Sequence, residues 1–314
     1  MKRKAIIISI GGTKLTVKER HLFTKEKPWG VILFKRNIKS INQLKNLITT
    51  IKDLVKIKNF PIIIDEEGSD VSRLKKIFSH NLNSRFFGNL YKKNKSLSLN
   101  LLKHYIFSLS KILKELGINI NSIPVLDISR TYTNKIIGNR SFSNDKMIVN
   151  DLGTTTIKYL HLNKIIGIIK HIPGHGAAKS DSHKETPKVK MNFQKLNRLD
   201  FYPFKNSKAK IAMTAHILYS KIDKKNVTTF SKKIIRDIIR KKIGFKGILI
   251  SDDISMKALK YSLVENAKKS LDAGCNLVLY CSGNINDNLK LIKSVPYIDK
   301  FTSKKTSEIY KFLR

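Results

Sequence analysis

A loop rich in histidine and glycine holds the densest group of reactive side chains in the 314-residue sequence. It runs from Lys170 through a Pro-Gly-His-Gly turn to Asp181 and His183. Glycine and proline at these positions indicate a tight turn, and the two-residue spacing lets the carboxylate of Asp181 meet the imidazole of His183. A carboxylate partner fixes the tautomer of a histidine and strengthens it as a general acid near neutral pH. We therefore predict acid–base chemistry in this loop.

The same loop has two other interpretations. His171, His175 and His183 could form a zinc site, but the glycine and proline residues between them favour a flexible loop over a rigid frame of ligands. A serine triad of Asp181, Ser182 and His183 fails, because the members of such triads come together from distant parts of a fold. We prefer neither interpretation, and we expect no metal and no cofactor.

Two adjacent acidic residues, Asp252 and Asp253, follow a second apolar segment. Residues 247–250 have the pattern of a buried strand, and Asp252 follows one residue later. A carboxylate at that place can attack an anomeric carbon or stabilise a cation-like transition state. We interpret the adjacent Asp253 as a helix N-cap, a position that aspartate favours.

Acidic residues also follow the apolar run at residues 61–64. Asp65 can accept hydrogen bonds from sugar hydroxyls, and Arg73 can donate to others. A divalent metal held by Asp65, Glu66 and Glu67 is the alternative for this segment.

Short β-rich apolar runs alternate with amphipathic stretches along the whole chain. Eight strands alternating with helices predict an α/β protein, a single (β/α)8 barrel of the TIM type. We expect residues 1–314 to form this one domain, with a mobile catalytic loop around residues 172–190. Strands are predicted at residues 5–10, 30–34, 61–64, 123–126, 165–169, 211–215, 247–250 and 277–280, and helices at 40–57 (with a serine N-cap), 96–116, 145–162, 232–242 and 263–273.

Titratable residues follow five of the predicted strands within two residues. In barrel enzymes the active site lies at the C-terminal ends of the strands. Any one of these residues could cap the next helix, but capping does not account for the set, so we expect them to meet at one mouth of the barrel. They are Asp65-Glu66-Glu67, Asp127, Lys170-His171, His216 and Asp252-Asp253.

The amino-acid composition indicates which binding partners and which cellular compartment to expect for the protein. The net charge is +39, but the lysines are spread along the chain, which favours codon drift in an AT-rich genome over a selected polyanion-binding surface. We expect only non-specific, salt-sensitive adhesion to nucleic acid. No apolar run approaches the roughly 20 residues that span a bilayer, no secretory signal is recognised, and two cysteines give no disulfide framework. A cytoplasmic monomer without a membrane partner is expected.

Three segments together resemble the family-3 β-N-acetylglucosaminidases of peptidoglycan recycling. Residues 170–176 are similar to the family's K-H-F-P-G-H-G stretch, with Ile172 in place of Phe, and residues 181–187 carry D-S-H-K-E-T-P unchanged. Residues 251–256 are similar to S-D-D-L-S-M, with Ile254 in place of Leu. The resemblance also covers residues 30–37, 124–127, 137–142 and 271–275.

The resemblance implies a role for each candidate residue. Asp252 matches the nucleophile that forms a covalent glycosyl-enzyme, His183 the general acid/base, and Asp181 its partner. The implied reaction releases N-acetylglucosamine from a 1,6-anhydro-N-acetylmuramic acid, with or without attached peptide. The residues implied to hold the sugar ring are Asp65, Arg73, Arg140, Lys170 and His171.

The sequence departs from the family in one loop. After Asp65 the family usually has Q-E-G-G-R, whereas this chain has Glu66-Glu67-Gly68-Ser69-Asp70. Serine at 69 matters only where the backbone needs a positive φ, and Asp70 adds negative charge beside Glu67. Two other functions stay open: a phosphorylase on the same scaffold, and a polyanion-binding barrel whose catalysis has decayed.

Overall fold

The computed structural model describes residues 2–134 and 137–314. Its centre is a closed barrel of eight parallel strands, ordered β1-β10-β9-β7-β5-β4-β3-β2. The barrel closes where β1 pairs with β10, with Ile6 opposite Val278. The predicted α/β class and (β/α)8 barrel are confirmed. The barrel strands are β1 (Lys4–Ile8), β2 (Pro28–Leu33), β3 (Ile62–Ile64), β4 (Ile120–Asn121), β5 (Ile166–Ile172), β7 (Ile211–Thr214), β9 (Ile248–Asp253) and β10 (Leu277–Leu279).

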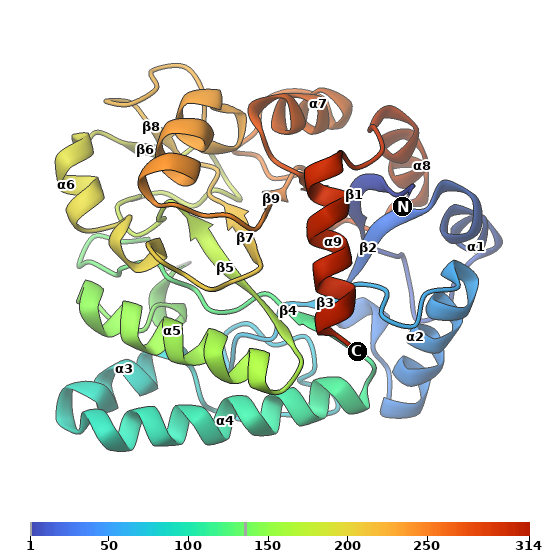
Figure 1. The fold of residues 1–314 in the computed structure, drawn as a ribbon, viewed down its shortest axis with the longest axis horizontal. Coiled ribbons are helices and arrows are strands. Elements are labelled where there is room, and N and C mark those ends of the chain that lie inside the picture. The colour runs from blue at the N-terminus through green and yellow to red at the C-terminus, as the bar shows by residue number, and fades with distance from the viewer. Residues whose placement is uncertain (1, 135–136) are drawn as a thin grey trace.

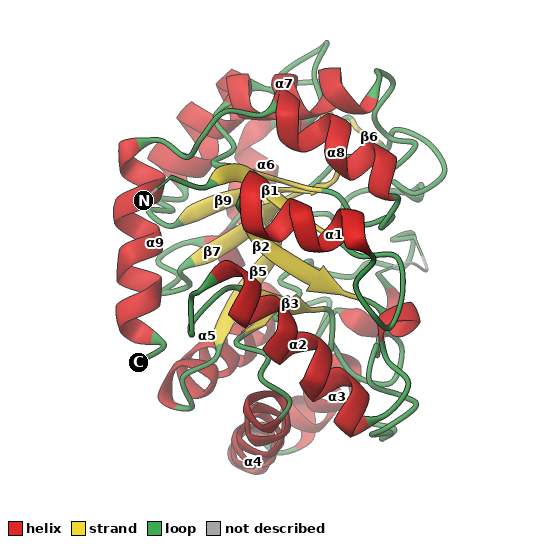
Figure 2. Ribbon diagram, turned by 90° about the vertical axis from the view of Figure 1, so that its right-hand side faces the viewer, coloured by secondary structure: helices red, strands yellow, loops and turns green. Residues whose placement is uncertain are grey.

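Helices surround this barrel on all sides (Figures 1 and 2). Two short strands, β6 (Lys188–Val189) and β8 (Leu218–Tyr219), pair with each other outside it. Across the described residues we find no helix with the length and apolar character that crossing a bilayer requires. The helices are α1 (Val17–His21), α2 (Ile41–Val55), α3 (Ser84–Lys93), α4 (Lys95–Glu115), α5 (Lys146–Leu162), α6 (Phe193–Arg198), the wide helical segment η6 (Ile234–Lys242), α7 (Leu263–Ala273), α8 (Ile285–Ser294) and α9 (Lys300–Phe312).

The core has two layers, because strands of a parallel barrel are buried on both faces. Inward-facing side chains such as Ile7, Ile63 and Ile168 fill the barrel, and outward-facing ones pack against the helices. Helix α9 lies across the amino ends of the strands (Figure 2), where Ile309 joins the interior cluster. The amino end is therefore closed, and the carboxyl end is left for a site.

Helix ends follow the local signals in the sequence. The predicted serine N-cap is confirmed, since Ser40 Oγ accepts the N–H of Gln43 at the start of α2. Asp145 caps α5 in the same way. Gly117 follows α4 with a φ of +84°, a conformation that favours glycine.

The position of the fourth strand was predicted wrongly. The prediction was residues 123–126, whereas the hydrogen-bonded strand is β4, three residues earlier. Pro124 has no N–H to give to a ladder, and Val125 forms only an isolated bridge with Lys170. Leu126 still donates its N–H to the Lys170 carbonyl at 2.7 Å, so Asp127 reaches the mouth of the barrel as expected.

Helices α1, α3, α6, α8 and α9 were not predicted. In α9 the buried positions include Thr302 and Thr306 as well as Ile309, so hydrophobic periodicity is weak. In α3 the helical sequence pattern is interrupted by Gly88. Glycine is required at this position, since a Cβ there would lie 1.7 Å from the carbonyl oxygen of Phe142.

Candidate active site

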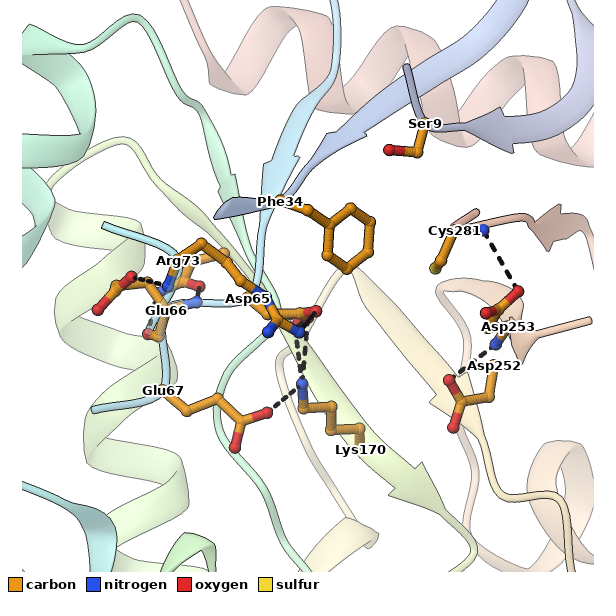
Figure 3. Close-up of polar contacts among 12 residues, drawn as sticks. Ser9, Phe34, Asp65, Glu66, Glu67, Arg73, Lys170, Asp252, Asp253 and Cys281 are labelled. Atoms are coloured by element: carbon orange, nitrogen blue, oxygen red, sulfur yellow. Dashed lines mark hydrogen bonds and ion pairs between the residues drawn. The ribbon is translucent and has the colours of Figure 1, made fainter. Parts of the chain in front are cut away.

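A cavity of about 310 Å³ opens at the carboxyl ends of the barrel strands. Its lining brings together side chains that lie far apart in the sequence, and Figure 3 shows Asp252 across the cavity from Asp65 and Glu67. Of the eight predicted site residues, Asp181 alone does not line it. The seven that do are Asp65, Arg73, Arg140, Lys170, His171, His183 and Asp252.

Asp252 is the next-to-last residue of β9 and points into the cavity (Figure 3). One of its carboxyl oxygens accepts the N–H of Asp253 at 2.8 Å. Burial alone would raise the pKa of Asp252, but its interactions with His171, His216, the N–H of Asp253 and Lys170 together hold it below its usual value. The carboxylate is therefore ionised at neutral pH, as a nucleophile must be.

A network of charged groups lies on the opposite side. Arg73 binds Asp65 at 3.0 Å, and Lys170 Nζ lies 3.4 Å from the other oxygen of Asp65 and 2.6 Å from Glu67. Ser122 donates a short hydrogen bond to Asp65 and accepts one from Lys170. Burial would raise the pKa of Asp65, but Lys170 and Arg73 outweigh it and hold that pKa well below its usual range.

Glu67 joins this network to Arg140. The guanidinium of Arg140 donates to both Glu67 oxygens, at 2.7 and 3.0 Å. Burial opposes ionisation of Glu67, yet Arg140 and Lys170 lower its pKa to about 2. Glu67 was not among the predicted site residues, although it follows β3 with Asp65. Its function here is to hold two cations in place.

Glu67→Gln is expected to lower the free energy of unfolding at pH 7 by about 3 kcal/mol, because a pKa unit corresponds to about 1.4 kcal/mol. A depressed carboxyl pKa stabilises the fold above the ordinary value of 4.5, and this stabilisation is lost as the pH falls toward about 2. Urea unfolding at pH 7 and pH 3 should therefore show a smaller difference at pH 3. Glu308→Gln, at an exposed pair with Lys305, should cost less than about 1 kcal/mol. Equal effects of both substitutions would contradict this role.

His171 is oriented by a buried carboxylate. Asp127 accepts from His171 Nδ1 at 2.7 Å and from the backbone N–H of His175 at 2.5 Å. Because a carboxylate only accepts, Nδ1 carries the hydrogen and Nε2 is left for a ligand. Asp127 was predicted at a strand end but not as a site residue, and its contribution is to position two histidines.

The expected contact between Asp181 and His183 is present. The Asp181 carboxylate lies 2.9 Å from His183 Nδ1 and accepts the His183 N–H at 2.9 Å. Burial would raise the pKa of Asp181, but these contacts lower it. The His183 side chain is 59% exposed while still lining the cavity, so the imidazole can reach both a ligand and solvent.

The base of the loop predicted to be catalytic, residues 172–190, is held by close contacts with its surroundings. A Cβ at Gly176 would lie 1.8 Å from the carbonyl oxygen of Ile128, so only glycine allows this backbone approach. Gly174 has a φ of +139°, and Tyr219 donates a short hydrogen bond to its carbonyl. Farther along, Ala258 donates its N–H to the Ser182 carbonyl at 3.1 Å.

The loop after Asp65, whose sequence differs from the family, still positions Asp65 and Arg73. Ser69 is not among the residues with positive φ, so serine is accommodated there, and its N–H binds the Leu82 carbonyl at 2.8 Å. Asp70 is exposed. The bond between Arg73 and Asp65 is intact.

Two other strand-end residues have roles that differ from the predictions. Asp253 does not cap a helix: its carboxylate accepts from Ser255 and from the N–H of Cys281, while Ser262 caps α7. The chain after β9 forms turns, and the next helix begins only at Leu263. His216 is buried between Thr229 Oγ1 and the Asp253 carbonyl, and it does not line the cavity.

The two metal-binding interpretations gain no support from the geometry. Within residues 2–134 and 137–314 no group of three or more His, Cys, Asp or Glu side chains has an arrangement that could hold a metal ion. The acidic groups of Asp65 and Glu67 are instead paired with Arg73, Lys170 and Arg140.

The chain has clear similarity to known proteins. Residues 5–305 match the glycosyl hydrolase family 3 N-terminal domain. A beta-hexosaminidase of Nitrosomonas eutropha is 34% identical over 284 residues, 88% of this chain and 80% of that protein. One from Haemophilus influenzae is 32% identical over 304 residues, 93% of this chain and 85% of that protein. Native NagZ from Neisseria gonorrhoeae matches with a TM-score of 0.88 and 29% identity, over 98% of this chain and 90% of that one.

Together with the barrel, these matches define the class of protein as a glycosidase. The chain belongs to glycosyl hydrolase family 3, and its type is that of the β-N-acetylhexosaminidases. A further structure of the Neisseria gonorrhoeae protein contains N-trifluoroacetyl-D-glucosamine.

Proposed function

We propose that the chain is a retaining exo-β-N-acetylglucosaminidase that acts through a covalent glycosyl-enzyme. It releases N-acetylglucosamine from 1,6-anhydro-N-acetylmuramic acid, with or without peptide, in cytoplasmic peptidoglycan recycling, and it acts as a monomer. The observation that carries the proposal is that the carboxylate of Asp252 and the imidazole of His183 line the same cavity. Asp181 binds Nδ1 of that imidazole.

The size of the cavity supports removal of one terminal sugar. Small-molecule sites range from about 300 to 1,000 Å³, and about 310 Å³ is at the low end, enough for one pyranose ring. The rest of the substrate would then lie outside, near the exposed His183.

The charges of the lining suit a neutral ligand. Arg73, Arg140 and Lys170 are balanced by the ionised carboxylates of Asp65, Glu67 and Asp252. Each cation has a carboxylate partner that fixes its direction, so N–H groups are presented to sugar hydroxyls without an excess of positive charge.

In the first step Asp252 attacks the anomeric carbon as the bond to the leaving sugar breaks. His183 gives its Nε2 proton to the leaving oxygen, while Asp181 accepts the hydrogen bond from Nδ1 and stabilises the charged ring. Asp65, Arg73, Arg140, Lys170 and His171 hold the N-acetylglucosamine ring.

In the second step a water molecule attacks the same carbon, His183 takes its proton, and the Asp252 carboxylate is released. Two inversions give a product of retained configuration. Movement of residues 172–190 would bring His183 to the leaving oxygen on binding, and its exposure is consistent with such movement.

The protein should hydrolyse an aryl β-N-acetylglucosaminide to free N-acetylglucosamine, with the β-anomer formed first, as read by NMR during turnover. The rate and product should be the same in phosphate and phosphate-free buffer, because Arg73, Arg140 and Lys170, the cavity cations among the described residues, are each already paired with a carboxylate. Sugar 1-phosphate as the product would replace the hydrolase with a phosphorylase. An inactive wild type that still bound polyanions would favour the decayed barrel.

A further inference from the structure

Glu66 lies behind the sugar-binding side chains and has no part in the proposed reaction. Its side chain is buried at 0% exposure. Oε2 accepts the N–H groups of Arg73 and Leu74 at 2.8 and 3.0 Å. Oε1 is also buried and has no hydrogen-bond partner among the described residues. Asn121 of β4 fixes the Glu66 backbone through bonds to its N–H and carbonyl.

We propose that Glu66 keeps its proton in the folded protein at neutral pH and positions Arg73 as an uncharged group. A buried carboxylate needs a cation or several donors to offset its lost hydration. The Glu66 carboxyl has two backbone N–H groups and the Ser72 side chain beside it, but Oε1 makes no well-aligned hydrogen bond with the described residues. Arg73 is the neighbouring cation, yet it is paired with Asp65 at 3.0 Å, and its Nε also has no partner among the described residues. A neutral acid accepts through its carbonyl oxygen, as Oε2 does, and its O–H on Oε1 can donate to the hydroxyl of Ser72, which interacts with the Glu66 carboxyl.

Among the described residues, the other titratable groups around Glu66 are not cations. From α4, Tyr105 faces Glu66, and burial together with Glu66 raises the pKa of Tyr105. His80 lies 3.4 Å from the Tyr105 hydroxyl, and burial lowers its pKa, so it is neutral. On the same segment Asp65 and Glu67 are ionised and would repel another negative charge. Burial raises the pKa of Glu66 against the opposing hydrogen bonds and Arg73.

The proton on Glu66 keeps Arg73 available to its ligand. A protonated carboxyl has the shape of glutamine, the residue that the resembling family usually has here. An ionised Glu66 would instead compete with Asp65 for the guanidinium of Arg73. This positioning role rests on the proposed function, in which Arg73 holds the sugar, whereas the protonation itself does not.

The protonation is tested without substrate, by urea unfolding of the wild type and Glu66→Gln from pH 5 to pH 8. A raised native pKa stabilises the protonated fold at low pH, and this stabilisation is lost as the pH rises above the ordinary value of 4.5. The unfolding constant of the wild type relative to Glu66→Gln should therefore rise with pH, by up to about tenfold per unit. A constant ratio, or one that falls with pH, would overturn the proposal whether or not the protein is a glycosidase.

The positioning role is tested by KM and kcat for an aryl β-N-acetylglucosaminide over the same range. The KM of the wild type relative to Glu66→Gln should rise with pH, with little change in the kcat ratio. Glu66→Ala, which leaves the N–H groups of Arg73 and Leu74 without an acceptor, should raise KM at every pH, and glutamine should restore it. An unchanged KM in Glu66→Ala would overturn the positioning role and leave the glycosidase proposal intact.

Discussion

Asp252→Ala is expected to lower kcat/KM for an aryl β-N-acetylglucosaminide on the order of 10⁴- to 10⁶-fold. Losses of this size are typical when one member of a group of cooperating catalytic residues is removed. The carboxylate is ionised, lies at the end of a rigid barrel strand and faces the cavity. No rotation of Asp253 replaces it, because the Asp253 carboxylate is engaged by Ser255 and Cys281. KM should change much less than kcat, since the sugar-binding side chains lie across the cavity.

Asp253→Asn is the matched control for this loss. It changes the neighbouring carboxylate on the same strand, and an asparagine oxygen can still accept the N–H of Ser255 and Cys281. The loss of activity should therefore be far smaller than for Asp252→Ala. Comparable losses from the two substitutions would contradict the assignment of the nucleophile to Asp252.

His183→Ala is the second large effect, with an expected loss of about 10²- to 10⁴-fold, the usual range for a general acid/base. The loss in the first step should depend on the leaving group. A nitrophenolate departs without a proton, whereas a sugar alkoxide needs one, so a disaccharide should lose more than a nitrophenyl glycoside. The second step is slowed for every substrate, because no base activates the water.

Azide distinguishes an acid/base role from a structural one. As a nucleophile that needs no base, azide should speed the second step in His183→Ala and give a β-glycosyl azide, while Asp252→Ala should gain no such product. Folding of both variants is checked by urea unfolding. Failure of azide to raise the rate of a folded His183→Ala would exclude His183 as the base.

The sequence predicted the side chains that face the cavity better than the contacts that support them. Asp65, Lys170 and Asp252 stand directly at strand ends, where a charged residue after an apolar run is conspicuous. Arg73 was proposed as a sugar donor from its place in the segment after Asp65, whereas Arg140 was assigned only through the resemblance, because it follows no strand. The pairing of Asp181 with His183 was predicted because it depends on two residues of local chain.

Supporting contacts depend on chain segments that sequence patterns do not relate. Glu67 is held by Arg140 and Lys170, 73 and about 100 residues away, and no local pattern predicts that pairing. Asp253 was assigned as a helix cap because aspartate favours that position, but a turn follows β9 instead. The fourth strand was placed too late because Pro124 and its apolar neighbours look like a strand while lacking the N–H that a ladder needs.

The most direct test of the central claim is mass spectrometry of His183→Ala during turnover of a nitrophenyl β-N-acetylglucosaminide. Because the first step needs little acid help and the second lacks its base, a covalent intermediate should accumulate. The account predicts an intact-protein mass increase of one N-acetylglucosaminyl group, located by peptide mapping on Asp252 and lost in the double variant His183→Ala, Asp252→Ala. An adduct on another residue, or turnover limited by the second step with no adduct, would contradict it.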